Sequence, residues 1–282
     1  MRLYIEHHTI FRYDHLVREQ TGEARLQPRD GEGQQLVGAR VVLDPATPVS
    51  PISDRFGNAV HCYSVLPWHK RLTVTATSLV ETSDSALIAA PPLSPLERHD
   101  YLSPSRYAPQ TWELALFART HVHGDDDEAR ALSLMAAIFD TCEYVPGSTD
   151  ISTTAEAVLM GRQGVCQDFA HLLLALCRAE RIPARYVSGY LYDPAKPHDA
   201  VLASHAWAEV FVGGQGWLAL DPTHNRPTNA TYVRVAVGRD YADATPVRGF
   251  YKGMAAEKME VQVFIRRVDE WLTVGSGGEI AT

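Results

Sequence analysis

The chain has 282 residues, of which 45% are apolar and 21% are charged, so it can bury a substantial core as one large domain or two ordinary ones. Its formal net charge is −8 and its basic residues form no clustered patch, which argues against nucleic acid or an anionic membrane as a partner. The N-terminus lacks the continuous apolar core of a signal peptide, and no run reaches the length of a membrane span, so we expect a cytoplasmic protein.

The first part of the chain, residues 1–84, has the pattern of β-strands. Alternating or β-rich segments include LYIEHHTIFRY, VHCYSVL and KRLTVTATSLVET, and the pair Gly57-Asn58 suits a hairpin turn. This pattern predicts a small β-sandwich-like domain, and its scattered histidines are expected to be surface residues. Residues 85–110 are rich in proline and serine, so they are predicted to be a linker.

Residues 111–282 are predicted to form an α+β domain, with helices first and an antiparallel sheet after them. Acidic residues open the helical segment DDDEARALSLMAAIFDTCEY, and Thr153 and Glu156 have the spacing of a capping box. A further helix follows Cys166 and ends near Arg181, because a proline comes soon after it. The strands expected next are ARYVSGYLY, SHAWAEVFV, GWLALDPT, VRVAVG and KMEVQVFIRRV.

Cys166 lies in the segment GVCQDFAH, at the predicted start of an apolar helix. At about 100° per residue, Asp168 and His171 lie roughly 200° and 140° round the helix from it, so these three residues are poorly placed to share a metal ion. Cys177 lies roughly 16 Å further along the helix axis, which excludes a disulfide while the helix is intact. The four cysteines are few and widely spaced, so no disulfide framework is expected.

Two interpretations of Cys166 remain open. It is either a buried core thiol, as we expect for Cys62, Cys142 and Cys177, or a nucleophile. The first turn of a helix stabilises a thiolate through the helix dipole and its free N–H groups. Gly164 lets the backbone turn tightly and approach a substrate. A nucleophile would still need a base and a group that orients the base.

His205 and Asp221 are the candidates for those two roles, since they lie on neighbouring predicted strands joined by the turn sequence GGQG. If the turn spans residues 213–215, Trp207 faces Asp221, and His205 is the diagonal neighbour of Asp221 on the same face of the sheet. A loop of two or four residues without a bulge would put His205 and Asp221 on opposite faces. We expect the helix that begins at Cys166 to cover the face that carries His205.

Three ordered motifs carry a family resemblance. They are GVCQDFAHLLLALCRAERIPARYVSGYLY, SHAWAEVFVGGQGWLALDPT and VRVAVGRDYADATPVRGFYKG. Together, over roughly residues 130–265, they resemble the bacterial transglutaminase-like family, a branch of the papain-related transglutaminase superfamily. The β-rich N-terminal region also resembles the domain that precedes this core in bacterial members. The resemblance implies a papain/transglutaminase-like core, with helices packed on an antiparallel sheet.

The resemblance also implies a catalytic triad in the order cysteine, histidine, aspartate. Carried onto this chain, Cys166 is the nucleophile, His205 the general base and acid, and Asp221 the residue that orients the imidazole. The family further implies an oxyanion hole made by the N–H of the nucleophile and an upstream side chain. Tyr144, in CEYVPG, and Gln163 are the two candidates for that side chain.

The implied chemistry is acyl transfer from an amide or peptide substrate through an acyl-thioester, without a cofactor or a metal. The leading hypothesis is a transglutaminase-like cysteine peptidase or amidase, in which water accepts the acyl group. An amine-transferring transglutaminase and a noncatalytic interaction module are the alternatives. Calcium would need an acidic cage, and the acidic run from Asp125 to Glu128 is better explained as a helix cap.

Overall fold

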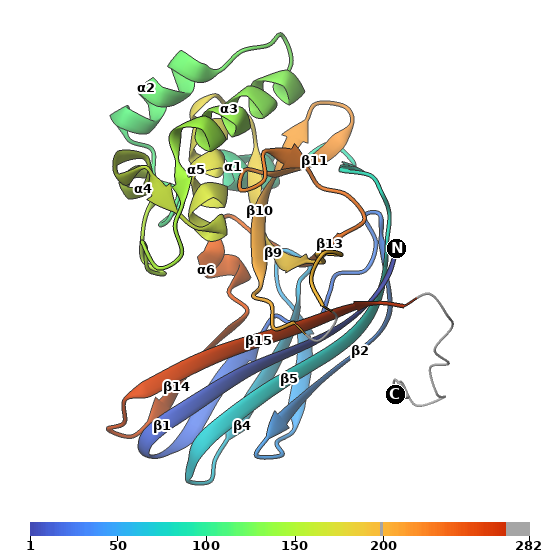
Figure 1. The fold of residues 1–282 in the computed structure, drawn as a ribbon, viewed down its shortest axis with the longest axis vertical. Coiled ribbons are helices and arrows are strands. Elements are labelled where there is room, and N and C mark those ends of the chain that lie inside the picture. The colour runs from blue at the N-terminus through green and yellow to red at the C-terminus, as the bar shows by residue number, and fades with distance from the viewer. Residues whose placement is uncertain (198–199, 269–282) are drawn as a thin grey trace.

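The computed structural model describes residues 1–197 and 200–268. Long strands form an extended, curved sheet in the lower half of Figure 1, and helices packed on a second sheet form the upper half. The strands are β1 (Arg2–Ala24), β2 (Gln34–Asp44), β3 (Val49–Ser53), β4 (Ala59–Val65), β5 (His69–Thr82), β6 (Leu87–Ala89), β7 (Glu143–Tyr144), β8 (Gln163–Gly164), β9 (Ala184–Leu191), β10 (His205–Val212), β11 (Gly216–Asp221), β12 (Arg226–Pro227), β13 (Tyr232–Gly238), β14 (Val247–Lys252) and β15 (Glu257–Arg267). The helices are α1 (Pro95–Leu102), α2 (Trp112–His121), α3 (Asp127–Thr141), α4 (Ala155–Gly161), α5 (Cys166–Ala179) and α6 (Tyr241–Ala244).

The N-terminal sheet is organised around β1. The first part of this strand pairs with β5 and β15, and its last residues pair with β4 and β14. Residues from both parts share one apolar core, which includes Phe11, Tyr63 and Leu72. Alternation of buried and exposed side chains along β1 produces this packing, as period-two strands require. The predicted strand-rich, sandwich-like N-terminal region is therefore confirmed.

The end of the described chain differs from the predicted domain division. Residues 247–267 were assigned to the second domain, but β14 and β15 return to the N-terminal sheet and pair with β1. Val263 and Ile265 of β15 are buried against Leu3 and Ile5 of β1, and this burial stabilises the pairing. Within the predicted linker, β6 adds to the second sheet through β11, and α1 forms a capped helix.

The second half of the molecule is built around α5. All of its residues from Asp168 to Arg178 are buried, because α2, α3 and α4 surround it on one side and β9 and β10 on the other (Figure 1). Its apolar side chains join the largest core of the protein with Leu134 of α3 and Val158 of α4. The predicted α+β core, with helices on an antiparallel sheet, is confirmed.

The second sheet has the strand order β12-β11-β10-β9-β13. In the hairpin of β10 and β11, Val212 pairs with Gly216, so residues 213–215 form the loop. This three-residue loop is the one that the sequence analysis required for His205 and Asp221 to share a face.

The face that α5 covers is not the one expected. Helix α5 packs on the side of β10 that carries Ala206, Ala208 and Val210, and not on the side that carries His205 and Trp207. Small alanine side chains let the helix approach the sheet closely, whereas Trp207 belongs to a separate aromatic core with neighbouring strands.

The face opposite α5 is covered by the segment between β1 and β2. Glu209 is fully buried there, with its carboxylate 2.7 Å from Nε of Arg185 and 3.4 Å from Nη1 of Arg234. Glu32, from the N-terminal part of the chain, completes the cluster by contacting Arg185 at 3.2 Å. The buried carboxylate of Glu209 is therefore paired, and the cluster joins side chains from the two halves of the molecule.

Side-chain amides from the N-terminal part also cover the edge of β13. Asn58 is fully buried; its side chain donates to the carbonyl oxygen of Val237 at 2.7 Å and accepts from the N–H of the same residue at 2.8 Å. Gln34 makes the same pair of bonds with the backbone of Arg234. These amides satisfy backbone groups that an edge strand would otherwise leave unpaired.

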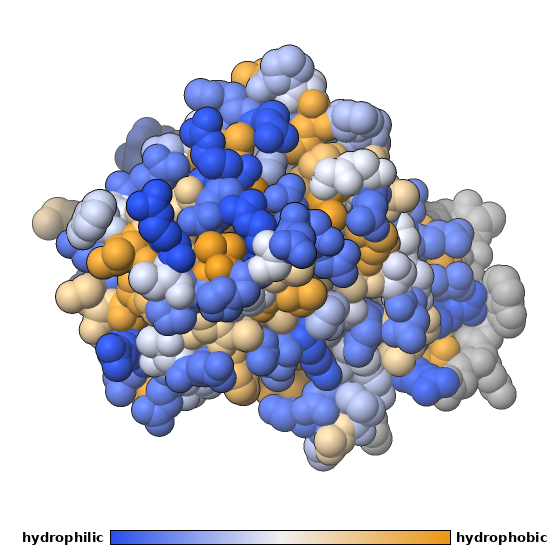
Figure 2. Space-filling model, turned by 90° about the horizontal axis from the view of Figure 1, so that it is seen from above, coloured by the Kyte–Doolittle hydropathy of each residue, from blue (hydrophilic) through white to orange (hydrophobic). Residues whose placement is uncertain are grey.

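The helical surface carries both polar and apolar side chains (Figure 2). Trp112, Leu116 and Met160 are exposed apolar residues, and they line a hollow of about 520 Å³ between α2 and α4. The lining of this hollow contains neither cysteine nor histidine, in contrast to the cavity described below. Among the described residues, none of the helices combines the length and the hydrophobicity needed to cross a membrane.

Candidate active site

Cys166 is the first residue of α5, as predicted. Val165 precedes it in an extended conformation, and the N–H of Val165 donates to Oδ2 of Asp168 at 2.8 Å, which caps the helix. The side chain of Thr149 donates to the same oxygen. Gly164 must be small, because an added Cβ would lie only 2.9 Å from the Cβ of Asp168. The helix cap and this close contact together fix the position of the Cys166 thiol at a helix N-terminus.

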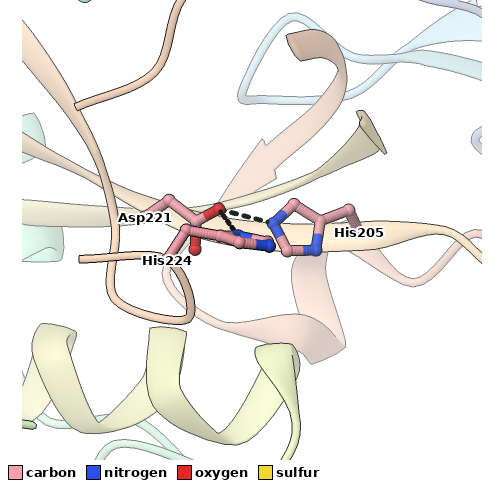
Figure 3. Close-up of side chains that lie close together, drawn as sticks. All are labelled: His205, Asp221 and His224. Carbon is pink, nitrogen blue, oxygen red and sulfur yellow. Dashed lines mark hydrogen bonds and ion pairs between the residues drawn. The ribbon is translucent and has the colours of Figure 1, made fainter. Parts of the chain in front are cut away.

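His205 and Asp221 meet as the hairpin register predicted. Nε2 of His205 lies 2.8 Å from Oδ2 of Asp221, and the two side chains point toward each other from β10 and β11 (Figure 3). Asp221 is completely buried, and the side chain of His205 is only 10% exposed. Since Asp221 occupies Nε2, the other ring nitrogen of His205 is left for the thiol, and Cys166 and His205 line the same cavity.

The electrostatics of this group favour a charged imidazole. Burial alone would lower the pKa of His205, but hydrogen bonds with Asp221 and Cys166, and the charges of both groups, outweigh it and raise the pKa to about 9. Burial would raise the pKa of Asp221, yet hydrogen bonds from His205 and His224 hold it well below its ordinary value. The arrangement therefore supports a protonated His205 beside an ionised Asp221 at neutral pH.

Asp221 has further partners that the sequence analysis did not identify. Its Oδ2 also accepts from Nδ1 of His224 at 2.7 Å and from the hydroxyl of Tyr232 at 2.7 Å, and its Oδ1 accepts from the N–H of Thr223 at 2.9 Å. His224 follows the DPT motif directly, so proximity to Asp221 in sequence was the available signal. Tyr232 comes from β13 and carries no such signal.

These residues also resemble a metal-binding set. The ligand atoms of His205, Asp221 and His224 lie within 4.8 Å of one another. Each of them is already engaged in a hydrogen bond, and a metal ion would have to displace those protons.

The acidic run from Asp125 to Glu128, considered for calcium, caps a helix as predicted. Asp126 accepts from the N–H of Ala129 and caps α3.

A cavity of about 220 Å³ opens onto Cys166 and His205. The second half of the molecule contributes Tyr186 of β9 and Tyr241 of α6 to its lining. The N-terminal sheet forms the facing wall, with side chains from β1, β14 and β15. These wall residues are His7, Thr9, Val247, Met259 and Val261. The cavity thus lies between the two halves, and the sequence assigned no role to the sheet that closes it.

The two candidates for the oxyanion side chain are placed differently. Tyr144 pairs in register with Gly164, and its pKa is raised first by partial burial and then by the charge of Cys166. Gln163 and Tyr144 are both exposed, and neither side chain lines the cavity. Tyr186, which the sequence analysis did not consider, lines the cavity, and its pKa is raised well above the ordinary value by burial and by Cys166.

Tyr186 is held by a stack of rings. His171 lies between Tyr107 and Tyr186, with ring centroids 5.0 and 4.9 Å away, and it accepts from the N–H of Tyr241 at 3.1 Å. Burial lowers the pKa of His171 to about 3, so this imidazole is neutral. His171, like Cys177, therefore serves packing and positioning and not acid–base chemistry.

Family models match both halves of the chain. The transglutaminase-like superfamily matches residues 115–222, and the bacterial transglutaminase-like N-terminal region matches residues 3–81. The first match contains all three residues of the Cys166, His205 and Asp221 group.

Individual proteins resemble the chain over most of its length. An uncharacterized protein of Mycobacterium leprae is 32% identical over 95% of this chain and 99% of its own. The crystal structure of a candidate cysteine protease from Cytophaga hutchinsonii is 28% identical, covers 96% of this chain and 92% of its own, and has a TM-score of 0.76. A protein-glutamine gamma-glutamyltransferase of Pseudomonas aeruginosa is 27% identical, but over 56% of this chain and 28% of its own.

Proposed function

Because this chain belongs to the transglutaminase-like superfamily, we propose that it is a cysteine-dependent hydrolase of amide or peptide bonds. One observation carries the proposal: Cys166, at the start of α5, faces an imidazole that is held by a buried carboxylate, and the cavity opens onto both Cys166 and the imidazole. A nucleophile, a base and an orienting group in this order form the constellation needed for acyl transfer.

In the first half of the proposed reaction, the thiolate of Cys166 attacks the carbonyl carbon of the substrate. The free N–H groups in the first turn of α5 stabilise the negative oxygen that forms. His205, protonated on the nitrogen that faces the thiol, then gives its proton to the leaving amine as the C–N bond breaks. The products of this half are a free amine or ammonia and an acyl-thioester on Cys166.

In the second half, neutral His205 takes a proton from water as the water oxygen attacks the thioester. The C–S bond breaks, the acid is released, and the thiolate of Cys166 and the imidazolium of His205 are restored. Asp221 holds the ring through Nε2 in both halves, so that the other nitrogen stays directed at the reacting atoms. No cofactor is needed for either half.

For the side chain of the oxyanion hole we propose Tyr144 over Gln163. Both side chains are exposed and outside the cavity lining, but the pKa of Tyr144 is raised by partial burial and then by the charge of Cys166, which links its hydroxyl to the thiol. Tyr186, which lines the cavity with Cys166, is the rival. Tyr144→Phe should lower kcat with little change in KM, because an oxyanion donor acts mainly in the transition state. If Tyr186→Phe has this effect and Tyr144→Phe does not, the assignment passes to Tyr186.

Transfer of the acyl group to a primary amine is the second candidate function. The relative from Pseudomonas aeruginosa that is named a protein-glutamine gamma-glutamyltransferase supports it, since the match includes more than half of this chain. The same three residues would carry both reactions. The difference lies in whether water or an amine reaches the thioester first.

Intact-mass spectrometry of the thioester tests the proposal. A panel of peptide and amide substrates is mixed with the protein, quenched in acid and weighed. We expect an added acyl mass that maps to Cys166 and is absent from Cys166→Ala. A primary alkyl amine is then titrated into the reaction, and the ratio of acid to amide product separates hydrolase from transferase. No acylation of Cys166 by any activated acyl donor would support a noncatalytic module instead.

A further inference from the structure

One oxygen of Asp221 is shared by two imidazoles. Oδ2 accepts from Nε2 of His205 at 2.8 Å and from Nδ1 of His224 at 2.7 Å, and the two ring centroids are 5.5 Å apart (Figure 3). His224 is 42% exposed, whereas Asp221 is completely buried. A partly exposed side chain therefore bonds directly to the buried carboxylate of the proposed triad.

We propose that His224 is a positioning residue that acts through Asp221: by donating to the oxygen that binds His205, it fixes the carboxylate and limits how firmly His205 holds its proton. The proposal deepens the proposed function and rests on it, because it assigns a task to His224 within the same triad. It makes the group a tetrad in which only Cys166 and His205 touch the reacting atoms.

His224 helps to orient the carboxylate of Asp221. Asp221 ends β11, where its side chain could rotate about the Cβ–Cγ bond. The N–H of Thr223 holds Oδ1 at 2.9 Å, and His224 holds Oδ2 from the same loop. With both oxygens fixed by this loop, Oδ2 stays directed at Nε2 of His205 even while the imidazole changes charge. A preorganised carboxylate needs no rearrangement during proton transfer.

His224 also affects the strength of the hydrogen bond between Asp221 and His205. A carboxylate oxygen that accepts several hydrogen bonds is a weaker acceptor for each of them, because every donor compensates part of its charge. Tyr232 donates to the same oxygen at 2.7 Å, and its hydroxyl accepts from Nε of Arg226 at 3.3 Å. Removing the His224 donor should therefore leave Asp221 more basic, and His205 would release its proton less readily.

The charged and titratable groups that face His205 and Asp221 come from several elements. Cys166 comes from α5, His224 from the loop after β11, Arg226 from β12 and Tyr232 from β13. Arg226 reaches Asp221 only through Tyr232. Among the side chains that bond to Asp221 directly, His224 is exposed, whereas Tyr232 is buried and His205 is mostly buried.

Three variants test the proposal. His224→Leu keeps a similar volume, so that water does not simply replace the donor. His224→Asn keeps a donor at the same number of bonds from Cα but cannot carry charge. His15→Leu is the matched control, because His15 is an exposed histidine whose Nδ1 lies 2.9 Å from Oδ1 of Asp14 on the N-terminal sheet.

The first measurement is the pKa of His205 by imidazole NMR, supported by the pH dependence of Cys166 alkylation. In His224→Leu we expect the pKa of His205 to rise by about 0.5 to 1. The alkaline limb of the pH profile for Cys166 alkylation should move to higher pH by the same amount. On the best substrate of the screen, kcat should fall by about three- to tenfold, with KM nearly unchanged. His224→Asn and His15→Leu should match the wild type.

An unchanged or lowered pKa of His205 in His224→Leu would overturn the proposal. Equal behaviour of His224→Asn and His224→Leu would also overturn it, because it would show that the donor has no part in the effect. The NMR titration does not depend on turnover. If no substrate acylates Cys166, the proposed function fails, while the coupling of His224 to His205 is still decided by the titration.

Discussion

Replacing Asp221 by asparagine should preserve the fold and remove most of the catalytic power. The two side chains have the same shape, and Thr223 can still donate to the remaining carbonyl oxygen. Asparagine carries no charge, and its amide can hold His205 in the wrong tautomer, with the proton on the nitrogen that must accept one. We expect kcat to fall by about 10²- to 10⁴-fold.

Part of this loss follows from the electrostatics of His205, and the wrong tautomer accounts for the rest. The pKa is about 9 in the intact site, and burial alone would take it below the ordinary value of 6.5. At pH 7.5, a pKa of about 9 gives roughly thirty imidazolium rings for every neutral one, and a pKa of 6.5 or lower gives at most about one for ten. Because Asp221 contributes more to the raised pKa than Cys166 does, Asp221→Asn should remove much of the imidazolium form, up to about nine-tenths of it.

The same change affects stability. Because the pKa of His205 is higher in the folded chain than in the unfolded chain, its stabilising contribution is complete below about pH 6.5 and is lost as the pH rises through about 9. For the wild type we expect the free energy of unfolding to fall by up to about 3 kcal/mol across this window. Asp221→Asn should lack this fall.

Two assays check these expectations. Urea unfolding at pH 6 and pH 9.5 gives the difference in free energy, and iodoacetamide kinetics across the same range report the thiolate of Cys166. Asp221→Glu, which keeps the charge but moves it, is the control that separates charge from geometry. If Asp221→Asn retains the wild-type alkylation profile, the charge of Asp221 does not hold the proton on His205 and the reasoning is refuted.

Further predictions concern the thiols, the helix start and the buried ion cluster. Iodoacetamide near neutral pH should modify Cys166 first, since burial raises the pKa of Cys177 to about 12; peptide mapping that finds another cysteine modified first would count against the nucleophile. Gly164→Ala should lower both the melting temperature and the labelling rate of Cys166, because the new Cβ would lie 2.9 Å from that of Asp168, and unchanged values would contradict this contact. Glu209→Ala should cost about 3–5 kcal/mol in urea unfolding, because two buried arginines lose their fully buried counter-charge and keep only the partly exposed Glu32. A cost below about 1 kcal/mol would show that Glu32 or solvent compensates them.

The sequence brought His205 and Asp221 together only under one of the possible hairpin registers, and the family resemblance named them as a pair. A hairpin joins neighbouring strands, so its register depends on local turn chemistry. The glycines of GGQG allow the three-residue loop over residues 213–215 that the structure shows, but they do not exclude a loop of two or four residues. The start of α5 at Cys166 is equally local, because Gly164 and the apolar run after the cysteine mark the helix boundary. Features within about twenty residues of one another were therefore predictable to within a few alternatives.

Features that depend on distant parts of the chain were not predictable from the sequence. The alternation of apolar and polar residues in β15 predicts a strand but does not identify its partner. Only the folded chain shows that β15 pairs with β1. The cavity wall from Met259 and Val261 follows from that pairing. Tyr186 lies in a strand whose residues are almost all buried, so alternation gave no indication that its ring borders the thiol.

The unexpected position of α5 explains how the site is assembled. The helix covers the Ala206 and Ala208 face of β10, whereas Asp221 belongs to the opposite face with Trp207. His205 can connect the two because it is the first residue of β10, where no earlier residue of that strand blocks its ring. A histidine in the middle of the strand would be confined to one face. The strand end thus lets a single imidazole join a thiol at one face of the sheet to a carboxylate at the other.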